Sequence, residues 1–212
     1  MKGPLDIHQH LLAHDVRHEI VRLPRTAPSA PSLAEALGLP AHRCVAVHPF
    51  HATTATGDLL AVVLAPADLE IDNDSMAGSL SELLRVRLGE SARFTLASAT
   101  LVSKHTDYLA GHVAPLLLPP GVIVVAVQPL VDLAATIVYT ATGDAGTALA
   151  LRALDLLVLT RAIVVPERRR TARRRPITID LEQAPAPDRV EVAARQHGST
   201  GRPGAVVTKA AS

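Results

Sequence analysis

Residues 44–65 read Cys-Val-Ala-Val-His-Pro-Phe-His-Ala-Thr-Thr-Ala-Thr-Gly-Asp-Leu-Leu-Ala-Val-Val-Leu-Ala. Two largely apolar runs, Cys44–Phe50 and Leu59–Ala65, flank the polar stretch His51–Asp58. β-Branched residues are enriched in strands, and a polar stretch with a glycine between two such runs is typical of a hairpin connection. We therefore expect two strands joined by a turn at the centre of the fold.

Capping and turn residues mark further elements on both sides of this pair. Ser32-Leu-Ala-Glu35 has the spacing of a capping box, and Gly38 stands where that short helix should end. Gly143-Asp-Ala-Gly146 predicts a turn. In chain order we expect a helix at 6–14, a strand at 16–23, a helix at 32–38, the two central strands, helices at 79–88 and 98–109, strands at 122–127 and 137–140, an extended segment at 148–151 and a helix at 153–160.

The composition favours one domain with an aliphatic core. The chain has 212 residues, of which 48% are hydrophobic and only 2% aromatic. A core of useful size can form, but Leu, Val, Ile and Ala must build it. With so few aromatic residues, a nucleic-acid surface based on base stacking is not expected.

Cysteine usage and hydropathy predict a protein of the reducing cytoplasm. Cys44 is the single cysteine, which excludes an internal disulfide framework and a cysteine-based zinc site. The first fifteen residues, MKGPLDIHQHLLAHD, lack the apolar region of a signal peptide. The longest apolar run, residues 120–138, is interrupted by Pro129 and Asp132, so it predicts buried strands and no membrane partner.

Basic residues gather toward the C-terminus. From Pro166 onward the chain has ten Arg or Lys against five Asp or Glu, so this segment carries +5 and the preceding residues −4 of the net +1. Its Pro-, Gly- and Ala-rich composition buries too little apolar area to offset the entropy of ordering. We therefore expect a folded domain at 1–165 and a mostly flexible basic tail at 166–212.

Several short motifs occur in a fixed order between about Leu5 and Val165. They are an N-terminal helix and strand, the helix Ser32–Gly38, the strand pair through Cys44 and Leu59, Pro66-Ala-Asp68, the loop Gly111-His-Val-Ala-Pro115, Val131-Asp132, Val138-Tyr-Thr-Ala-Thr-Gly143, Gly146 and Asp155-Leu-Leu157. Each motif is common by itself. Their order and spacing resemble the YbaK/EbsC-type aminoacyl-tRNA deacylases, the family of prolyl-tRNA synthetase-associated editing domains.

This resemblance implies an α/β (α+β mixed) domain, in which a curved mixed β-sheet surrounded by helices holds one pocket. It implies hydrolysis, in trans, of the ester of a mischarged tRNA such as Ala- or Cys-tRNA(Pro). The terminal ribose 2′-hydroxyl assists in that family, so neither a protein nucleophile nor a cofactor is implied. The implied partners are the tRNA acceptor end and a synthetase, and the absence of a coiled-coil heptad favours a monomer.

The resemblance also assigns residues. In that family the G-x-x-x-P loop supplies backbone groups at the substrate, and a strand lysine meets the tRNA end. Here the lysine position falls at Ala46, with no lysine between Lys2 and Lys104, and an often acidic position is Ala148. The implied substrate-binding residues are Gly111, His112, Val113, Ala114, Pro115, Ala46, Thr140 and Gly143. The implied tRNA contacts, which could equally be a solvated charge run, are Arg168, Arg169, Arg170, Arg173, Arg174 and Arg175.

Other side chains could compensate for the lysine. His48 shares a strand face with Ala46, so it could donate a hydrogen bond or act as a general base, or it could simply be satisfied by a neighbour. Cys44 is either a nucleophile or a small buried hydrophobe. His112 either borders the substrate or faces solvent, and Asp132 either orients a pocket group or caps a turn.

Histidine spacing raises the question of a metal. His10, His14 and His18 are four residues apart, but His18 falls in the expected strand and no H-E-x-x-H motif is present. A solvated polar face is the other interpretation, and we expect no metal site.

Two functional hypotheses remain open. The ordered match and the Gly111–Pro115 loop favour an editing deacylase with a remodelled pocket. The missing lysine favours a catalytically lapsed binding module of the same fold, which would recognise an amino acid, a nucleotide-like end or a protein partner.

Overall fold

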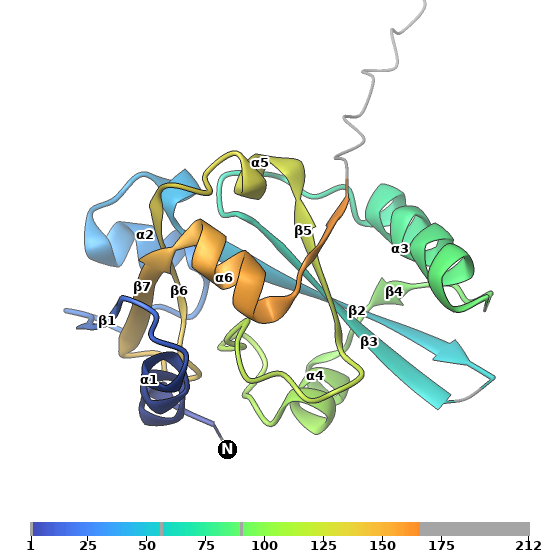
Figure 1. Ribbon diagram of the computed structural model, residues 1–212, viewed down its shortest axis with the longest axis horizontal. Helices are drawn as coiled ribbons and strands as arrows, with labels where there is room; N and C mark the ends of the chain where they lie inside the picture. The colour runs from blue at the N-terminus through green and yellow to red at the C-terminus, as the bar shows by residue number, and fades with distance from the viewer. Residues whose placement is uncertain (1, 56, 90, 166–212) are drawn as a thin grey trace, which may run out of the picture. The chain divides into compact units, whose positions relative to one another are not determined.

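The computed structural model describes residues 2–55, 57–89 and 91–165 and has the mixed α/β class expected from the sequence (Figure 1). Its helices are α1 (Pro4–Ala13), α2 (Ala30–Leu37), the short 3-10 helix η1 (Ala41–Arg43), α3 (Asn73–Leu88), α4 (Ala99–Thr106), α5 (Gln128–Val131) and α6 (Ala153–Thr160). Its strands are β1 (His18–Arg22), β2 (Val45–Thr54), β3 (Gly57–Pro66), β4 (Thr95–Leu96), β5 (Ile123–Val127), β6 (Ile137–Ala141), β7 (Thr147–Arg152) and β8 (Ile163–Val165).

The strands form two sheets. The five-stranded sheet has the order β4-β2-β3-β5-β8, in which β4, β2 and β3 are antiparallel while β3, β5 and β8 are parallel. The three-stranded sheet, β1-β7-β6, is antiparallel throughout. Among the described residues the two sheets meet at a single isolated parallel bridge, Cys44 to Tyr139. The mixed sheet expected from the sequence is therefore divided at this bridge.

The central hairpin is longer than the sequence predicts. Strand pairing runs from Val45–Pro66 to Thr54–Gly57, so most of the polar stretch expected as a turn belongs to the strands. Polar side chains fit these strands because they form hydrogen bonds between the two strands at the exposed end of the hairpin. The Thr53 hydroxyl donates to the Asp58 carboxylate at 3.3 Å, and the Thr54 hydroxyl donates to the Gly57 carbonyl at 3.0 Å.

The N-cap of helix α2 lies three residues before the expected cap, Ser32. Ser29 is the N-cap: its hydroxyl accepts from the Ser32 N–H, and the Ser32 hydroxyl accepts from the Ser29 N–H in return. Pro31 fits the first turn because the N–H that it lacks would have no helical partner there. Gly38 ends the helix in the left-handed conformation, as the sequence predicts.

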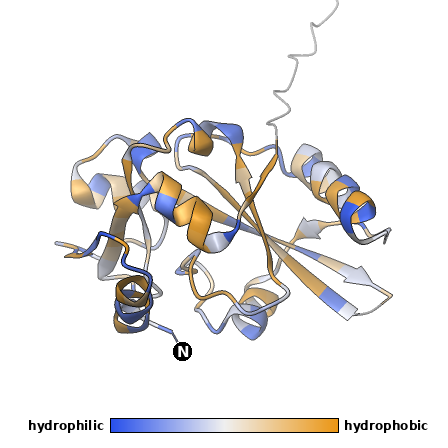
Figure 2. Cartoon of the chain, viewed as in Figure 1, coloured by the Kyte–Doolittle hydropathy of each residue, from blue (hydrophilic) through white to orange (hydrophobic). Residues whose placement is uncertain are grey.

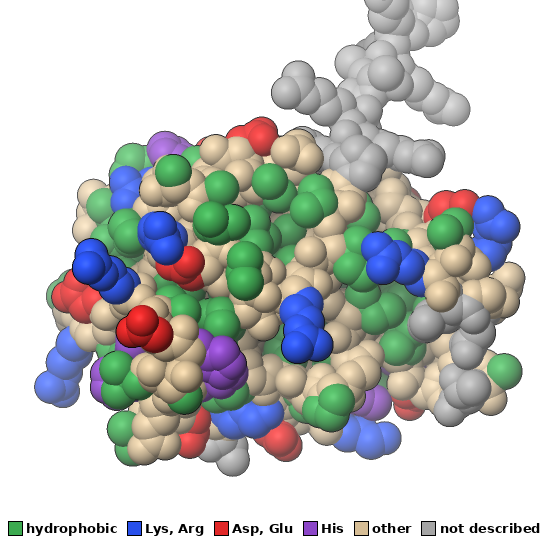
Figure 3. All heavy atoms as spheres, viewed as in Figure 1, with side chains coloured by type: hydrophobic (Ala, Val, Ile, Leu, Met, Phe, Trp, Pro, Cys, Tyr) green, Lys and Arg blue, Asp and Glu red, His purple; other side chains and the backbone are tan. Residues whose placement is uncertain are grey.

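Apolar and charged residues are distributed as a buried sheet requires. Apolar residues follow β3 and β5 through the interior (Figure 2). On the face drawn in Figure 3, Lys and Arg side chains stand apart from one another, among acidic and apolar groups. Several exposed arginines pair with a near neighbour in sequence, such as Arg85 with Glu82 and Arg152 with Asp155. Such exposed pairs contribute little stability.

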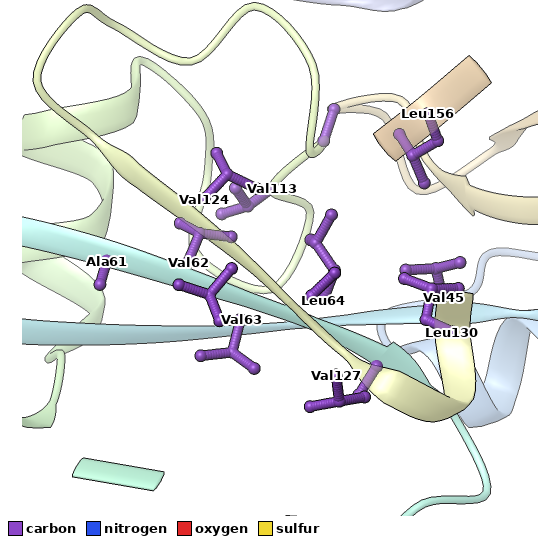
Figure 4. Close-up of a cluster of buried hydrophobic side chains, with 14 of the residues drawn as sticks. Val45, Ala61, Val62, Val63, Leu64, Val113, Val124, Val127, Leu130 and Leu156 are labelled. Carbon is purple, nitrogen blue, oxygen red and sulfur yellow. The ribbon is translucent and has the colours of Figure 1, made fainter. Parts of the chain in front are cut away.

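Strand β3 carries the main core. Residues 60–66 are all buried, because β2 and β5 cover both edges of the strand and neighbouring elements cover both faces. Side chains from β5, α5, α6 and the segment around Val113 converge on it (Figure 4). Three of the few aromatic side chains, Phe50, Phe94 and Tyr108, are also wholly buried.

The N-terminus secures the segment that contains the Gly111–Pro115 loop. Lys2 Nζ donates to the Leu117 carbonyl and lies 3.9 Å from the Asp107 carboxylate. The Tyr108 hydroxyl donates to the Leu116 carbonyl at 2.9 Å. Gly143 packs tightly against Lys2 and Tyr108. A Cβ at this position would lie 2.7 Å from the Lys2 carbonyl oxygen and 2.9 Å from the Tyr108 ring.

No helix in the described part of the chain has the length and apolar character needed to span a bilayer.

We expect Gly143→Ala to lower the free energy of unfolding by more than about 2 kcal/mol, since it combines a steric clash with a φ of +90°. Gly121→Ala is the matched control, because Gly121 has a φ of +97° but open space around its Cβ position. Denaturant unfolding of both variants separates the clash from the backbone strain. Equal losses in the two variants would contradict the packing role of Gly143.

Candidate functional site

A cavity of about 440 Å³ opens where β2 and β6 diverge from the Cys44–Tyr139 bridge. Residues of five segments line it: Ala27, Pro28, Ser29, Ala30, Pro31 and Leu33 from the start of α2; Val45, Ala46, Val47, His48 and Pro49 from β2; Ala97, Ala99 and Val102; Ala110, Gly111, His112 and Val113; and Ala141, Asp144 and Thr147. The wall is mostly small and apolar, with a few polar groups, as is usual for small-molecule sites.

The cavity follows an edge of β2 that lacks a strand partner. On the side away from β3, β4 pairs only with Phe50 and His51 among the described residues. The Ala97 N–H donates to the Pro49 carbonyl at 3.0 Å, which shows that odd-numbered residues of β2 direct their main-chain groups away from β3. Val47 has the same parity, so its N–H and C=O face the cavity side.

His48 is the half-buried imidazole of this wall. Its Nε2 is shielded from solvent, and no described residue offers it a hydrogen-bond partner. Burial lowers the pKa of His48 below its usual value of 6.5, so the ring is neutral at pH 7. A neutral imidazole in a cavity can take a proton from water or from a substrate group.

The loop beginning at Gly111 also lines the cavity. Gly111 has a φ of +89°, a conformation that favours glycine, and a Cβ there would lie 3.6 Å from the Pro28 carbonyl oxygen. The His112 N–H donates to the Leu109 carbonyl at 3.0 Å, while its side chain is half-buried at the cavity. Val113 is buried against the core and completes this wall.

Four of the expected substrate-binding residues do not line the cavity. Ala114 is buried in the core, and Pro115 lines a separate cavity of about 610 Å³. Thr140 is buried on β6, where Ala141 lines the cavity in its place. Gly143 packs against the N-terminus. The structure therefore brings Ala46 and His48 together with Gly111, His112 and Val113.

Cys44 lies outside the cavity wall, in a small apolar cluster with Leu33 and Ala148 beneath α2. Burial raises the pKa of its thiol to about 11, so the group is a thiol and not a thiolate at neutral pH. The structure favours the buried hydrophobe over the nucleophile. Ala148 itself is wholly buried, so an acidic side chain would have no solvent there.

Asp132 is also remote from the cavity wall. It caps the C-terminal end of α5, it is exposed, and it accepts a 2.9 Å hydrogen bond from the Gln128 side-chain amide. The capping role is the one that this geometry supports.

Sequence reasoning missed the acid of the wall, Asp144. It lies in the turn between β6 and β7, where its Oδ1 accepts the Gly146 N–H at 2.6 Å. The sequence Gly143-Asp-Ala-Gly146 contains this residue, but Asp is so common in turns that the turn alone explains its presence.

The histidines of the N-terminal region form two pairs and not the row of three that their spacing suggested. His8 Nδ1 lies 2.8 Å from His18 Nε2, and His18 Nδ1 donates to the Val16 carbonyl. The ring centroids of His10 and His14 lie 4.3 Å apart, with the ring planes tilted by 51°. No group of three or more His, Cys, Asp or Glu side chains in the described part of the chain could hold a metal ion.

The six arginines expected to contact tRNA, Arg168 to Arg175, lie outside the described residues, as does the whole of the expected tail.

The fold is similar to solved structures of proteins that resemble this chain only distantly in sequence. Hypothetical protein APE2540 is 22% identical, with a TM-score of 0.59, over 76% of this chain and 97% of its own. A candidate trans-editing enzyme for prolyl tRNA synthetase is 21% identical, with a TM-score of 0.56, over 77% of this chain and 94% of its own. No protein-family model and no curated protein matches the sequence. At these identities the similarity shows a shared fold.

We expect the Cys44 thiol to resist a thiol-reactive disulfide reagent at pH 8 in the folded protein, because the side chain is buried and its pKa is about 11. In guanidinium chloride the same residue should react fully and at once. Absorbance of the released chromophore measures both rates. Fast stoichiometric reaction of the folded protein would contradict the buried, protonated state.

Proposed function

We propose that this protein hydrolyses the ester of mischarged aminoacyl-tRNA in trans, with small aminoacyl groups such as those of Ala- or Cys-tRNA(Pro) as its substrates. The observation that carries the proposal is that one cavity combines the Gly111 loop with the neutral, unpartnered His48 imidazole. The fold shared with a candidate trans-editing enzyme supports it. The proposed partner is the acceptor end of tRNA, and the proposed location is the cytoplasm.

Small side chains make up much of the wall and leave room for an aminoacyl group. Among the described residues, seven alanines line the cavity of about 440 Å³: Ala27, Ala30, Ala46, Ala97, Ala99, Ala110 and Ala141. Pockets of this kind bind by shape, and each methylene group changes affinity by about 1–3 kcal/mol.

The proposed reaction needs only water and groups of the chain or the substrate. A water oxygen attacks the ester carbonyl carbon, and the neutral His48 ring accepts the proton that this water loses. The bond between the carbonyl carbon and the ribose oxygen then breaks. That oxygen takes the proton from the His48 ring and leaves as a hydroxyl, and the ring becomes neutral again. The main-chain N–H groups of Gly111 and Val113 would stabilise the developing oxyanion, since the His112 N–H already donates to the Leu109 carbonyl.

The wall offers no cation to the phosphates of a tRNA end. Among the described residues that line the cavity, none is Lys or Arg. We therefore propose that the arginine run at 168–175 supplies the phosphate contacts, through an electrostatic attraction that does not depend on sequence.

The same observation favours the second candidate, a binding module without turnover. A mostly apolar wall with no Lys or Arg suits an amino acid or a neutral ligand as well as a tRNA end. Saturable binding without ester hydrolysis would distinguish this candidate from the deacylase.

We expect His48→Ala to lower kcat/KM for deacylation of Ala-tRNA(Pro) by about 100-fold, the usual contribution of a general base. His42→Ala is the matched control, because His42 is exposed and lies outside the cavity wall. Wild-type kcat/KM should rise with pH through a pKa below 6.5 and then level off, since burial lowers the pKa of His48 and its neutral form is the active one.

Release of labelled amino acid measures these rates over a panel of mischarged tRNAs. Full activity of His48→Ala would remove the role of His48 but keep the enzyme. The absence of turnover on every substrate would refute the deacylase and leave the binding module.

We expect replacement of the six tail arginines by glutamine to weaken tRNA binding and to reduce the slope of log K against log salt by up to about 4. The substitutions are made in the full chain at Arg168, Arg169, Arg170, Arg173, Arg174 and Arg175. Three exposed arginines of the folded part, Arg17, Arg22 and Arg87, are replaced in a control variant. Filter binding over a salt series measures the slopes, and an equal loss per charge in both variants would contradict a specific role of the tail.

A further inference from the structure

Two strand edges present main-chain groups to the cavity. The main-chain N–H and C=O of Cys44 do not point toward Tyr139, its partner in the isolated bridge. The N–H donates to the Ala41 carbonyl, and the C=O accepts from the Ala67 N–H. The main-chain groups of Tyr139 therefore face β2. Ala141, two residues further along β6, has the same orientation and lines the cavity, opposite Val47 of β2.

Beyond the bridge the strands are too far apart to pair with each other. The carbonyls of Val47 and Ala141 are thus acceptors at two sides of one cavity. Both residues are only partly buried, so a ligand with several donors can reach these carbonyls and fit between them.

The fixed charge of the wall is negative. Asp144 is the single acidic side chain among the described residues that line the cavity, and no lining residue is Lys or Arg. The 2.6 Å bond from the Gly146 N–H holds its Oδ1 in place. A carboxylate can accept further hydrogen bonds, so the second oxygen remains able to bind a cationic donor.

Thr147 and His48 do not oppose a cation there. Thr147 lines the cavity beside Asp144, and its hydroxyl is paired with that of Thr142 at 2.6 Å. The His48 ring is neutral at pH 7, because burial lowers its pKa, and so it does not repel a positive charge.

We propose that this cavity recognises the free α-ammonium group of an aminoacyl ester, through the Asp144 carboxylate and the main-chain carbonyls of the diverging strands. An ammonium group has one positive charge and three donors to match these acceptors. N-Acylation removes the charge and leaves one donor. The site therefore accepts aminoacyl esters and rejects N-acylated or peptidyl esters. This proposal rests on the proposed function and names its substrate class.

The test compares Ala-tRNA with N-acetyl-Ala-tRNA as substrates of the full chain. Asp144 is exposed, so water can solvate its carboxylate when no ammonium is bound. Wild type should still hydrolyse the free aminoacyl ester at least about 10-fold faster, since hydrogen bonds between charged groups are stronger than neutral ones. Asp144→Asn keeps the acceptor for the Gly146 N–H but loses the charge. It should lower kcat/KM for Ala-tRNA about 10-fold or more and leave the rate on N-acetyl-Ala-tRNA unchanged.

Asp132→Asn is the matched control, because Asp132 is the exposed C-cap residue of α5 and lies outside the cavity wall. Both rates should stay at the wild-type level. Turnover of both substrates at equal rates would overturn the ammonium site while leaving the deacylase intact. If Asp144→Asn does not fold, as judged by circular dichroism, the wild-type comparison of the two substrates decides.

A binding measurement separates this inference from the proposed reaction. L-Alaninamide should raise the melting temperature of the wild-type protein, whereas N-acetyl-L-alaninamide should not, and Asp144→Asn should lose the difference. This pattern in a protein without turnover supports the ammonium site although the deacylase fails. No shift with either compound, or the same shift with both, in such a protein overturns the ammonium site.

Discussion

Strand β2 is paired along its whole length on one side and, within the described part of the chain, with a strand over only two residues on the other. The hairpin with β3 anchors it in the most deeply buried part of the core, so its position is fixed by burial and not by the open edge. Because β6 approaches that edge only at Cys44, the two sheets separate immediately afterwards. The cavity, its exposed main-chain groups and the position of His48 all follow from this one divergence.

Local patterns predicted the elements whose signals are local. The apolar runs gave the central strands, Gly38 gave the end of α2, and the helix at 153–160 occurs with the expected bounds. The extent of the hairpin was underestimated, because cross-strand hydrogen bonds stabilise polar residues that look like a turn in isolation. The division into two sheets depends on pairing between β1 and β7, which are more than one hundred residues apart, and no local pattern encodes such pairing.

The same distinction explains how far the site could be predicted. Two groups of cavity residues, Gly111 to Val113 and those of β2, each belong to one continuous segment. Once the sequence predicts that the segment lies at the site, its side chains follow. Thr140 and Ala141 differ by one position, and strand alternation sends them to opposite sides. Gly143 is needed by the packing of the N-terminus, a contact between distant parts of the chain. The role of Asp144 in the turn explains why an aspartate occurs there, so the sequence offered no separate reason to expect it in the cavity wall.

Alanine at position 46 changes the electrostatics of the cavity more than its shape. A lysine there, as the resembling family has, would place a cation on the wall that now carries one carboxylate and a neutral histidine. A phosphate and an ammonium group make opposite demands on such a wall, because the charge that attracts one repels the other. A cavity without the lysine is better suited to the aminoacyl group than to the nucleotide that carries it. Selectivity for the amino acid and affinity for the nucleic acid would then reside in different parts of the chain, which allows each to change without loss of the other.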